Sequence, residues 1–185
     1  MTSLSTKICL IGDFAAGKTS LIRRFVYAIF DDKYLSTIGV KVSRKTIPLV
    51  RQHASGGEDV VEMTMMLWDL AGSEEFDRVR SSYLRGAAGA ILVCDLTRPE
   101  TLDSLPGYAN DLWSASPGAR LVLAANKCDL TEQQQISTSQ LYAVAAQLNA
   151  SYYLTSAKAD TQVELVFHHL GGLLLPGAPN PAKDR

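Results

Sequence analysis

Hydrophobic residues along this chain form short strand-like runs that alternate with helix-like segments. The first run, KICLIGD, is followed by a glycine-containing turn and a helical stretch from about Lys18 to Tyr27. The runs GAILVCDL and RLVLAANK are continuously apolar, as in strands buried on both faces of a sheet, and SYYLTS is a candidate for the last strand. This alternation predicts an α/β fold with a largely parallel sheet and helices on both faces.

Two further β-rich runs, residues 40–50 and 60–69, are joined by the polar loop RQHASGGED with no helix between them. We therefore expect these two strands to pair antiparallel. Pro48 cannot donate a ladder hydrogen bond, which places the first of them at an edge of the sheet. The pattern thus predicts a six-stranded, mostly parallel sheet with one antiparallel edge strand.

Helix starts are indicated at three places by a Ser or Thr followed three residues later by Glu or Gln. These predicted capping boxes pair Thr97 with Glu100, Ser137 with Gln140, and Thr161 with Glu164. Within the helical pattern of residues 99–114, the pair Pro106 and Gly107 predicts a kink or a split.

Composition narrows the organisation and the classes of function. At 185 residues we expect one domain, residues 1–175, followed by a flexible tail, residues 176–185. Eighteen basic and 19 acidic residues give a net charge of -1, which argues against a nucleic-acid or anionic-membrane surface. The N-terminus lacks the apolar core of a signal peptide, and the apolar runs are too short to span a bilayer, so we expect a cytoplasmic protein. The three cysteines, which lack metal-ligand spacing, are expected to be reduced thiols.

The segment GDFAAGKT, residues 12–19, matches the pattern G-x-x-x-x-G-K-[ST] and lies between a predicted strand and a predicted helix. In such a loop, backbone N–H groups and the helix N-terminus surround an anion, the lysine neutralises the outer phosphates, and the Thr hydroxyl binds Mg2+. The glycine before the lysine lets the backbone approach the phosphates closely. We therefore expect nucleotide phosphates to bind at Ala15, Ala16, Gly17, Lys18, Thr19 and Ser20.

The segment NKCD, residues 126–129, follows the end of a buried strand, where ligands of open α/β sheets bind. The Asp129 carboxylate can accept two N–H donors from guanine, which adenine does not present. Four such residues could also form only a capped turn. Their combination with the phosphate loop and with TSAK, residues 155–158, favours GTP or GDP as the ligand.

These segments together resemble the Ras superfamily of small GTPases, and most closely its Rab branch, over about residues 6–174. YLSTIGV, residues 34–40, resembles the first switch, WDLAGSEEF, residues 68–76, the second, and SSYLRGA, residues 81–87, the Rab run that follows. The resemblance implies a monomeric molecular switch that binds GTP and GDP with magnesium, hydrolyses GTP slowly, and contacts effectors, exchange factors and activating proteins through its switch regions.

The resemblance also assigns roles to individual residues. Thr37 would bind magnesium and the γ-phosphate, Gly72 would donate its N–H to the γ-phosphate, and Asp69 would hold magnesium through water. Lys18, Thr37, Gly72 and Ser73 occupy the positions implied to be catalytic. The residues implied to contact guanine are Phe30, Asn126, Lys127, Asp129, Ser156, Ala157 and Lys158. Several of these have plainer readings: Phe30 as core, Thr37 as a strand start, and Asp69 as a turn cap.

Trp68 and Tyr83 match two of the three aromatic residues that shape the Rab effector face, and the third position is Val42. Both aromatic residues could instead have only a structural role, and the sequence leaves the two readings open.

The sequence departs from the family at Ser73, where relatives usually carry a glutamine that positions the attacking water. A serine hydroxyl is too short to reach as far, so we expect slower hydrolysis. Phe14 is a second departure, because relatives usually carry Gly or Ser there. Its ring would crowd an arginine entering from a partner, unless it folds outward.

Compensation could come from Arg78 or Arg80 acting as an arginine finger in cis, or from Glu74 or Glu75 orienting water. The favoured reading is that these residues are solvated charges on a mobile helix. The C-terminal end lacks the cysteines that are prenylated in Rab relatives, so we expect no direct lipid anchor; a soluble or bacterial member would suit this ending.

Three functions are compatible with these features. The leading interpretation is a slow, magnesium-dependent GTP hydrolase that acts as a switch. The alternative is a pseudo-GTPase that holds GTP constitutively because of Ser73 and Phe14. A phosphate-loop ATP kinase is opposed by NKCD and by the lack of an evident acceptor-substrate domain.

Overall fold

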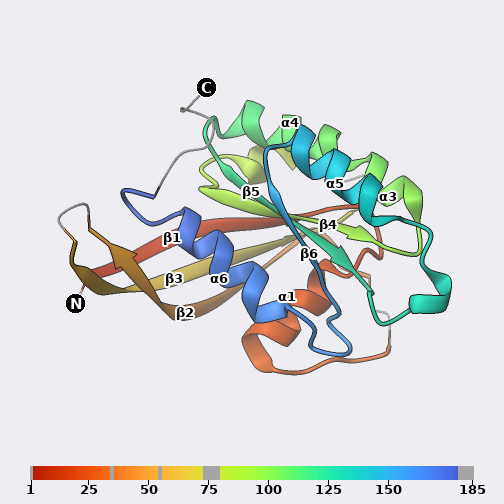
Figure 1. The fold of residues 1–185 in the computed structure, drawn as a ribbon, viewed down its shortest axis with the longest axis horizontal. Coiled ribbons are helices and arrows are strands. Elements are labelled where there is room, and N and C mark those ends of the chain that lie inside the picture. The colour runs from red at the N-terminus through yellow and green to blue at the C-terminus, as the bar shows by residue number, and fades with distance from the viewer. Residues whose placement is uncertain (1, 34–35, 54–55, 73–79, 179–185) are drawn as a thin grey trace.

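The computed structural model describes residues 2–33, 36–53, 56–72 and 80–178. Figure 1 shows a twisted central sheet with helices on both of its faces. The elements, in chain order, are β1 (Thr2–Ile11), α1 (Lys18–Tyr27), β2 (Val40–Gln52), β3 (Glu58–Leu70), β4 (Gly89–Asp95), α3 (Pro99–Asp103), α4 (Leu105–Ala115), β5 (Arg120–Asn126), the 3-10 helix η1 (Thr131–Gln133), α5 (Thr138–Gln147), β6 (Ser151–Leu154) and α6 (Val163–Leu173).

The six strands lie in the order β2-β3-β1-β4-β5-β6. β2 pairs antiparallel with β3, and the other neighbouring pairs are parallel. The predicted fold class is thereby confirmed, including the position of Pro48 on an edge strand. Because β1, β3, β4, β5 and β6 run in the same direction, their carboxyl ends meet at one side of the sheet.

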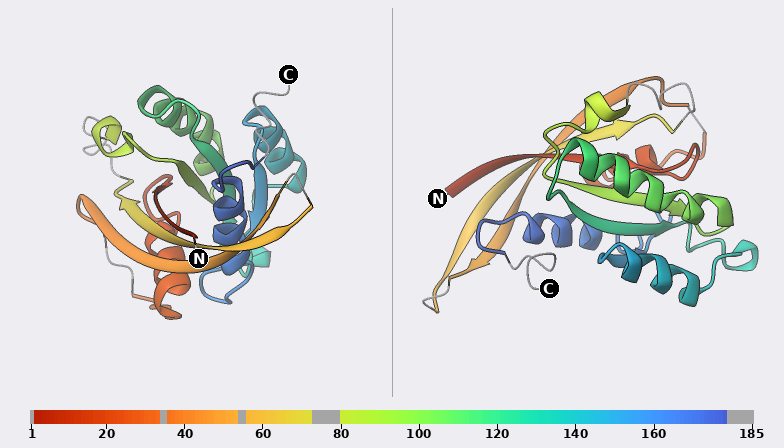
Figure 2. Two further views of the ribbon diagram at one scale, coloured as in Figure 1. Left: turned by 90° about the vertical axis from the view of Figure 1, so that its left-hand side faces the viewer. Right: turned by 90° about the horizontal axis from the view of Figure 1, so that it is seen from above.

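Two apolar cores lie on opposite faces of the sheet. α1 and α6 cover one face, where the rings of Phe25 and Phe167 stack with their centroids 4.0 Å apart. α3, α4 and α5 cover the other face through side chains such as Leu105, Leu112 and Leu141. Figures 1 and 2 show these two helical layers on either side of the sheet.

The β2–β3 hairpin is longer than the sequence pattern predicts. Both strands continue into the expected polar loop, to Gln52 and from Glu58, and Figure 2 shows the hairpin reaching beyond the shorter strands. Arg51 faces Asp59 in the ladder, and its guanidinium donates to both carboxylate oxygens at 2.9 and 2.5 Å. This cross-strand ion pair lets charged residues extend a ladder that a hydrophobicity pattern ends earlier.

The helix capping predictions are confirmed at one position and wrong at two. Ser137 and Gln140 form the predicted capping box of α5. Thr97 fails because its hydroxyl donates to Asp95 Oδ1 at 2.7 Å, and α3 begins after Arg98 with no side-chain cap. Thr161 does not cap α6, because its backbone pairs with Ser156. The N-cap is instead Gln162, and α6 begins at Val163.

The predicted split in the helix near residue 106 is confirmed, but it falls earlier. α3 ends at Asp103 and α4 begins at Leu105, so Pro106 and Gly107 lie inside the first turn of α4. A proline is tolerated there because the first-turn N–H groups have no partner within the helix.

The described residues contain no helix both long and apolar enough to cross a membrane. The three cysteines are free, as predicted, with Cys9 and Cys94 buried. Of the predicted tail, residues 179–185 lie outside the described residues.

Candidate functional site

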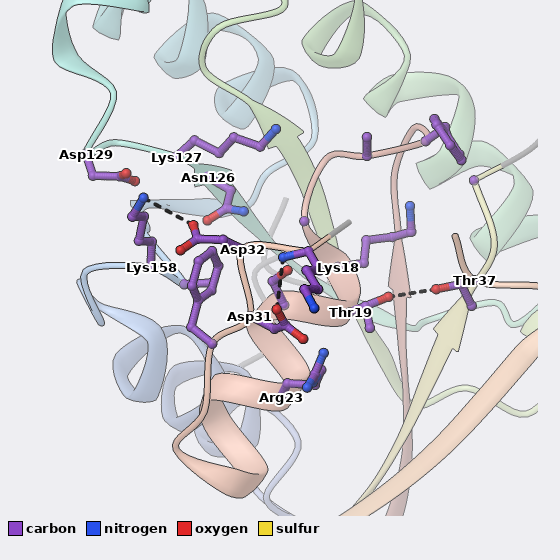
Figure 3. A pocket seen from close by; sticks show the side chains of 18 of the residues that line it. Lys18, Thr19, Arg23, Asp31, Asp32, Thr37, Asn126, Lys127, Asp129 and Lys158 are labelled. Carbon is purple, nitrogen blue, oxygen red and sulfur yellow. Dashed lines mark hydrogen bonds and ion pairs between the residues drawn. The ribbon is translucent and has the colours of Figure 1, made fainter. Parts of the chain in front are cut away.

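A pocket of about 310 Å³ lies at the carboxyl ends of the parallel strands, within the usual size range of small-ligand sites. Its walls come from the loop after β1, the start of α1, residues 30–33, Thr37, the end of β3, and the segments after β5 and β6. Figure 3 shows that its labelled side chains converge from these separate segments. The sheet topology alone brings the predicted phosphate loop and NKCD together here.

Lys18 begins α1 and is buried within the phosphate loop. Its ammonium donates to the carbonyl oxygens of Gly12 at 2.6 Å and Asp13 at 2.8 Å, which fixes the side chain across the loop. Burial lowers the pKa of Lys18 to about 8, although Asp69 and Asp13 act in the opposite direction. A phosphate would remove this penalty, because an anion beside the ammonium favours its charged form.

Two glycines of this loop are required by close contacts. Gly12 lies against β4, where a Cβ would come within 2.2 Å of the Val93 carbonyl oxygen. Gly17 has a φ of +102°, and a Cβ there would lie 2.1 Å from Asn126 Nδ2. That amide donates to the Ala16 carbonyl oxygen at 3.0 Å. The loop and NKCD therefore hold each other in place, with room for glycine only.

A chain of three oxygens joins the phosphate loop to both switch segments. The Thr19 hydroxyl donates to Asp69 Oδ2 at 2.5 Å. It also lies 2.8 Å from the Thr37 hydroxyl, and Figure 3 marks this second bond with a dashed line. Asp69 is buried, and its other oxygen, Oδ1, has no hydrogen-bond partner among the described residues. A buried carboxylate oxygen without a partner is costly, and hydroxyl and carboxylate oxygens are the ligands that magnesium prefers.

The donor set therefore fits magnesium. Burial raises the pKa of Asp69, while the Thr19 hydroxyl and the nearby Lys18 oppose that shift. No group of three His, Cys, Asp or Glu side chains that could hold a metal occurs in the described ranges. Magnesium is bound through few protein oxygens and keeps several water ligands beside substrate phosphates.

Gly72 lies directly against the phosphate loop. A Cβ at this position would come within 2.5 Å of Phe14 N and 2.6 Å of the Asp13 carbonyl carbon. The segment after β3 can therefore approach the loop this closely only through a glycine. Ser73, Glu74, Glu75 and Arg78 lie outside the described residues, so the predictions made for them stay predictions.

The predicted base site is held by hydrogen bonds between the segments after β5 and β6. Asp129 Oδ1 accepts the Ser156 hydroxyl at 2.6 Å, and that hydroxyl oxygen in turn accepts the Ala159 N–H at 2.9 Å. Among the described residues, none donates a hydrogen bond to Asp129 Oδ2. Asn126 lies at the end of β5 and spans to the phosphate loop. The carboxylate is thus oriented by one oxygen, which leaves the other for a ligand.

The remaining predicted base-site residues frame this pocket. Lys127 has a φ of +66° and pairs with the buried Asp95 at 2.6 Å, which places its stem along the pocket wall. Lys158 pairs with Asp32 at 3.2 Å, and Figure 3 shows this bridge at the pocket mouth. Phe30 is half-buried and both lines the pocket and packs on the α1–α6 core, so its two readings are compatible.

Most predicted site residues that the structure describes line the pocket directly. Three others lie behind the lining residues and hydrogen-bond to them. Ala16, Asp69 and Ser156 are buried and do not line the pocket. Each instead bonds a residue that does: Asn126, Thr19 and Asp129, respectively.

The prediction for Arg80 is wrong. Its guanidinium is only 7% exposed, pairs with Asp111 at 3.1 Å and lies 4.5 Å from the Tyr108 ring centroid. It is therefore neither a solvated charge nor directed into the pocket as an arginine finger. Phe14 lines the pocket, is 47% exposed, and accepts a hydrogen bond from Arg98 at its carbonyl oxygen.

Sequence reasoning missed four charged residues that line the pocket: Arg23, Asp31, Asp32 and Lys33. Arg23 lies one helical turn after Thr19 on α1. Its i, i+4 spacing from this predicted magnesium ligand could have identified it as a pocket residue. The other three follow Phe30 directly. Figure 3 shows Arg23, Asp31 and Asp32 along one wall of the pocket.

A comparison with protein families now adds to this geometry. The Ras family model matches residues 7–174, which include every described part of the pocket. The chain belongs to the Ras family. Rab-named relatives place it in the Rab branch, and the fold agrees with that of the small GTPases.

Three relatives illustrate the similarity to this Rab-type chain. It is 37% identical over 162 residues to the Ras-related protein RABD2c of Arabidopsis thaliana, which covers 87% of this chain and 76% of the relative. It is 32% identical over 165 residues to Rab-13 of Canis lupus familiaris, covering 89% and 77%. It is 33% identical over 165 residues to Rab-8A of Gallus gallus, covering 89% and 75%. GTP binding and GTP hydrolysis are properties of this family as a whole.

Proposed function

We propose that this protein is a magnesium-dependent switch that binds GTP and GDP and hydrolyses GTP slowly. One observation carries the proposal: Lys18, the Thr37–Thr19–Asp69 oxygen chain, and Asp129 line or directly support a single pocket. These three groups supply what phosphates, a hard cation and a guanine base each require.

The residues of this Rab-type pocket have distinct tasks in phosphoryl transfer. The Lys18 ammonium and the loop N–H groups stabilise the charge that develops on the phosphate oxygens. Thr19, Thr37 and Asp69 would hold magnesium, which would supply positive charge to offset the charge of the phosphates. Asp129 orients the base, so that the phosphates lie at a fixed distance from the loop.

Switching would depend on Thr37 and Gly72. Both already contact phosphate-loop residues, Thr37 through its hydroxyl and Gly72 through its close approach to Phe14. A γ-phosphate would add a ligand for both and order residues 34–40 and 71–80, and its loss would release them. Partner proteins (effectors, exchange factors and activating proteins) would bind the two states with different affinities. Trp68 and Tyr83, whose ring centroids lie 6.4 Å apart, would form part of the surface that they contact.

Gly72→Ala is expected to slow single-turnover GTP hydrolysis about ten- to a hundredfold, because the added methyl group would overlap the phosphate-loop backbone and overpacking costs about 1–3 kcal/mol. GDP affinity should change far less, because GDP lacks the γ-phosphate. The matched control is Gly172→Ala in α6, where an added Cβ has no neighbour within 4 Å. Equal rates for the two variants would remove Gly72 from the proposed switch.

The affinity for GDP is expected to fall as the pH rises above 8. In the free protein Lys18 loses its proton near a pKa of about 8, while a bound phosphate favours the charged form. Binding therefore takes up a proton above that pH, and affinity falls by up to about tenfold per pH unit. Fluorescent-GDP titrations between pH 7 and 9.5 measure this, and an affinity that stays flat or rises would contradict it.

The direct test of the proposed function is single-turnover phosphate release from preloaded GTP, with wild type beside Ser73→Gln. A barrier of about 22 kcal/mol corresponds to a family-like rate of about 3 × 10⁻⁴ s⁻¹, and one lost water-positioning hydrogen bond would slow it about ten- to a hundredfold. We expect slow hydrolysis by wild type and faster hydrolysis by Ser73→Gln. Ser139→Gln, at an exposed position in the first turn of α5, is the matched control.

The same experiment tests the alternative function. A pseudo-GTPase that holds GTP constitutively is favoured by the half-exposed Phe14 ring at the pocket, together with Ser73. If neither wild type nor Ser73→Gln releases phosphate while both retain GTP, the pseudo-GTPase is the better description of this protein. If neither binds GTP, both descriptions fail.

A further inference from the structure

Asp13, the second residue of the phosphate loop, faces the α3–α4 unit and does not line the pocket. Its Oδ1 accepts the Tyr108 hydroxyl at 2.5 Å, and its Oδ2 accepts the Ser104 hydroxyl at 3.0 Å. Its carbonyl oxygen accepts the Lys18 ammonium at 2.8 Å and the Ala16 N–H at 3.2 Å. One residue thus connects the phosphate-binding lysine to the helical layer on the far side of the loop.

Tyr108 contacts Asp13 through its hydroxyl group and Arg80 through its ring. The hydroxyl bonds Asp13, and the guanidinium of Arg80 lies 4.5 Å from the centroid of its ring. Arg80 is buried and bonds Asp111, one turn along α4. Burial, followed by the neighbouring Asp13, raises the pKa of Tyr108 to about 12, so its hydroxyl remains a neutral donor at physiological pH.

Two residues on either side of residues 73–79 therefore lie close to Asp13 or to its partner Tyr108. Gly72 packs against the Asp13–Phe14 backbone, where a Cβ would be only 2.5 to 2.6 Å away. Arg80 lies over the ring of Tyr108, whose hydroxyl bonds Asp13. A change in the phosphate loop at Asp13 is therefore expected to reach both Gly72 and Arg80, because these contacts are close and partly buried.

We infer that Tyr108 is a positioning residue for GTP hydrolysis, which couples the phosphate loop at Asp13 to Arg80. The inference rests on the proposed function. Tyr108 does not line the pocket, so it would act on hydrolysis only by positioning the phosphate loop from behind.

The first experiment uses Tyr108→Phe in the full chain, which removes the hydroxyl but keeps the ring beneath Arg80. Single-turnover phosphate release is expected to slow about tenfold, and fluorescent-GDP release to quicken about threefold, because Asp13 loses a charge-assisted hydrogen bond. Tyr142→Phe, at an exposed tyrosine of α5, is the matched control and is expected to match wild type.

The second experiment separates coupling from simple packing by a double-mutant cycle of Asp13→Ala and Arg80→Met. These two side chains are linked through Tyr108. With Tyr108 present, the hydrolysis rate of the double variant is therefore expected to differ by more than about threefold from the product of the two single effects. In the Tyr108→Phe background the departure should fall below about 1.5-fold. Asp13→Asn, which keeps an oxygen acceptor, is expected to restore most of the rate lost in Asp13→Ala.

The outcomes distinguish this inference from the proposed function. Additive effects in both backgrounds, or wild-type rates for Tyr108→Phe, would overturn the inference and leave the proposed function intact. If wild type binds GTP without hydrolysing it, the hydrolytic function fails, and GDP release rates in the same cycle decide whether the coupling exists. If wild type binds no guanine nucleotide, the proposed function fails and the inference fails with it.

Discussion

Replacing Lys18 by alanine is expected to weaken GTP and GDP binding by at least about a hundredfold. Loss of a buried, hydrogen-bonded charge at a binding site costs about 2–5 kcal/mol, and about 2.7 kcal/mol corresponds to a factor of one hundred. The Lys18 ammonium is held by the Gly12 and Asp13 carbonyl oxygens, at the centre of the phosphate loop. Lys18 is the one basic residue of the segment GDFAAGKT.

The stability of the free protein should respond quite differently to Lys18→Ala. Burial already opposes the charged form of Lys18, so its removal eliminates a desolvated charge as well as two hydrogen bonds. We therefore expect little change in Tm without nucleotide and a large loss of the nucleotide-induced rise in Tm.

Lys45→Ala is the matched control for this prediction. Lys45 lies outside the pocket and pairs with Glu164 at 2.8 Å, so its removal should leave nucleotide affinity unchanged. Equilibrium titration with fluorescent GTP and GDP, beside thermal melts with and without GDP, gives both quantities. A Lys18→Ala protein with wild-type affinity would rule out the phosphate-site assignment.

Asp129→Asn is expected to lower GTP affinity about a hundredfold or more and to raise the preference for xanthosine triphosphate. Ser156 donates its hydroxyl to Asp129 Oδ1 at 2.6 Å, and an asparagine carbonyl oxygen could accept the same bond. The amide NH₂ would then occupy the place of Oδ2 and face the N–H donors of guanine. Unpaired donors at a site built for hydrogen bonding reject a ligand strongly. Xanthine presents a carbonyl oxygen at that edge instead, which the new NH₂ can bond.

Competition between GTP and xanthosine triphosphate for the loaded protein measures this exchange directly. Asp160→Asn is the matched control, because it makes the same chemical change nearby at an exposed residue that does not line the pocket. An Asp129→Asn protein that still prefers GTP as strongly as wild type would remove Asp129 from the base site.

Local patterns predicted the strands and the fold class well. GDFAAGKT and NKCD each carry their chemistry within a few residues, and the apolar runs GAILVCDL and RLVLAANK became the buried strands β4 and β5. Such features can be predicted from the sequence because they depend on residues that are adjacent along the chain. The predictions that failed, at Thr97, Thr161 and Arg80, concern polar side chains with several partners within reach.

By itself, then, the sequence determined an α/β fold and two candidate ligand-binding segments, GDFAAGKT and NKCD. Only the tertiary structure decided how these parts support one another. The Asn126 amide bonds a carbonyl 110 residues away, and Tyr108 bonds Asp13 from 95 residues away. It also decided that Arg80 turns onto Tyr108 and that Asp69 has an oxygen without a described partner. The physical reason is that such contacts follow from the order of the strands and the packing of helices on the sheet, which no local pattern of residues encodes.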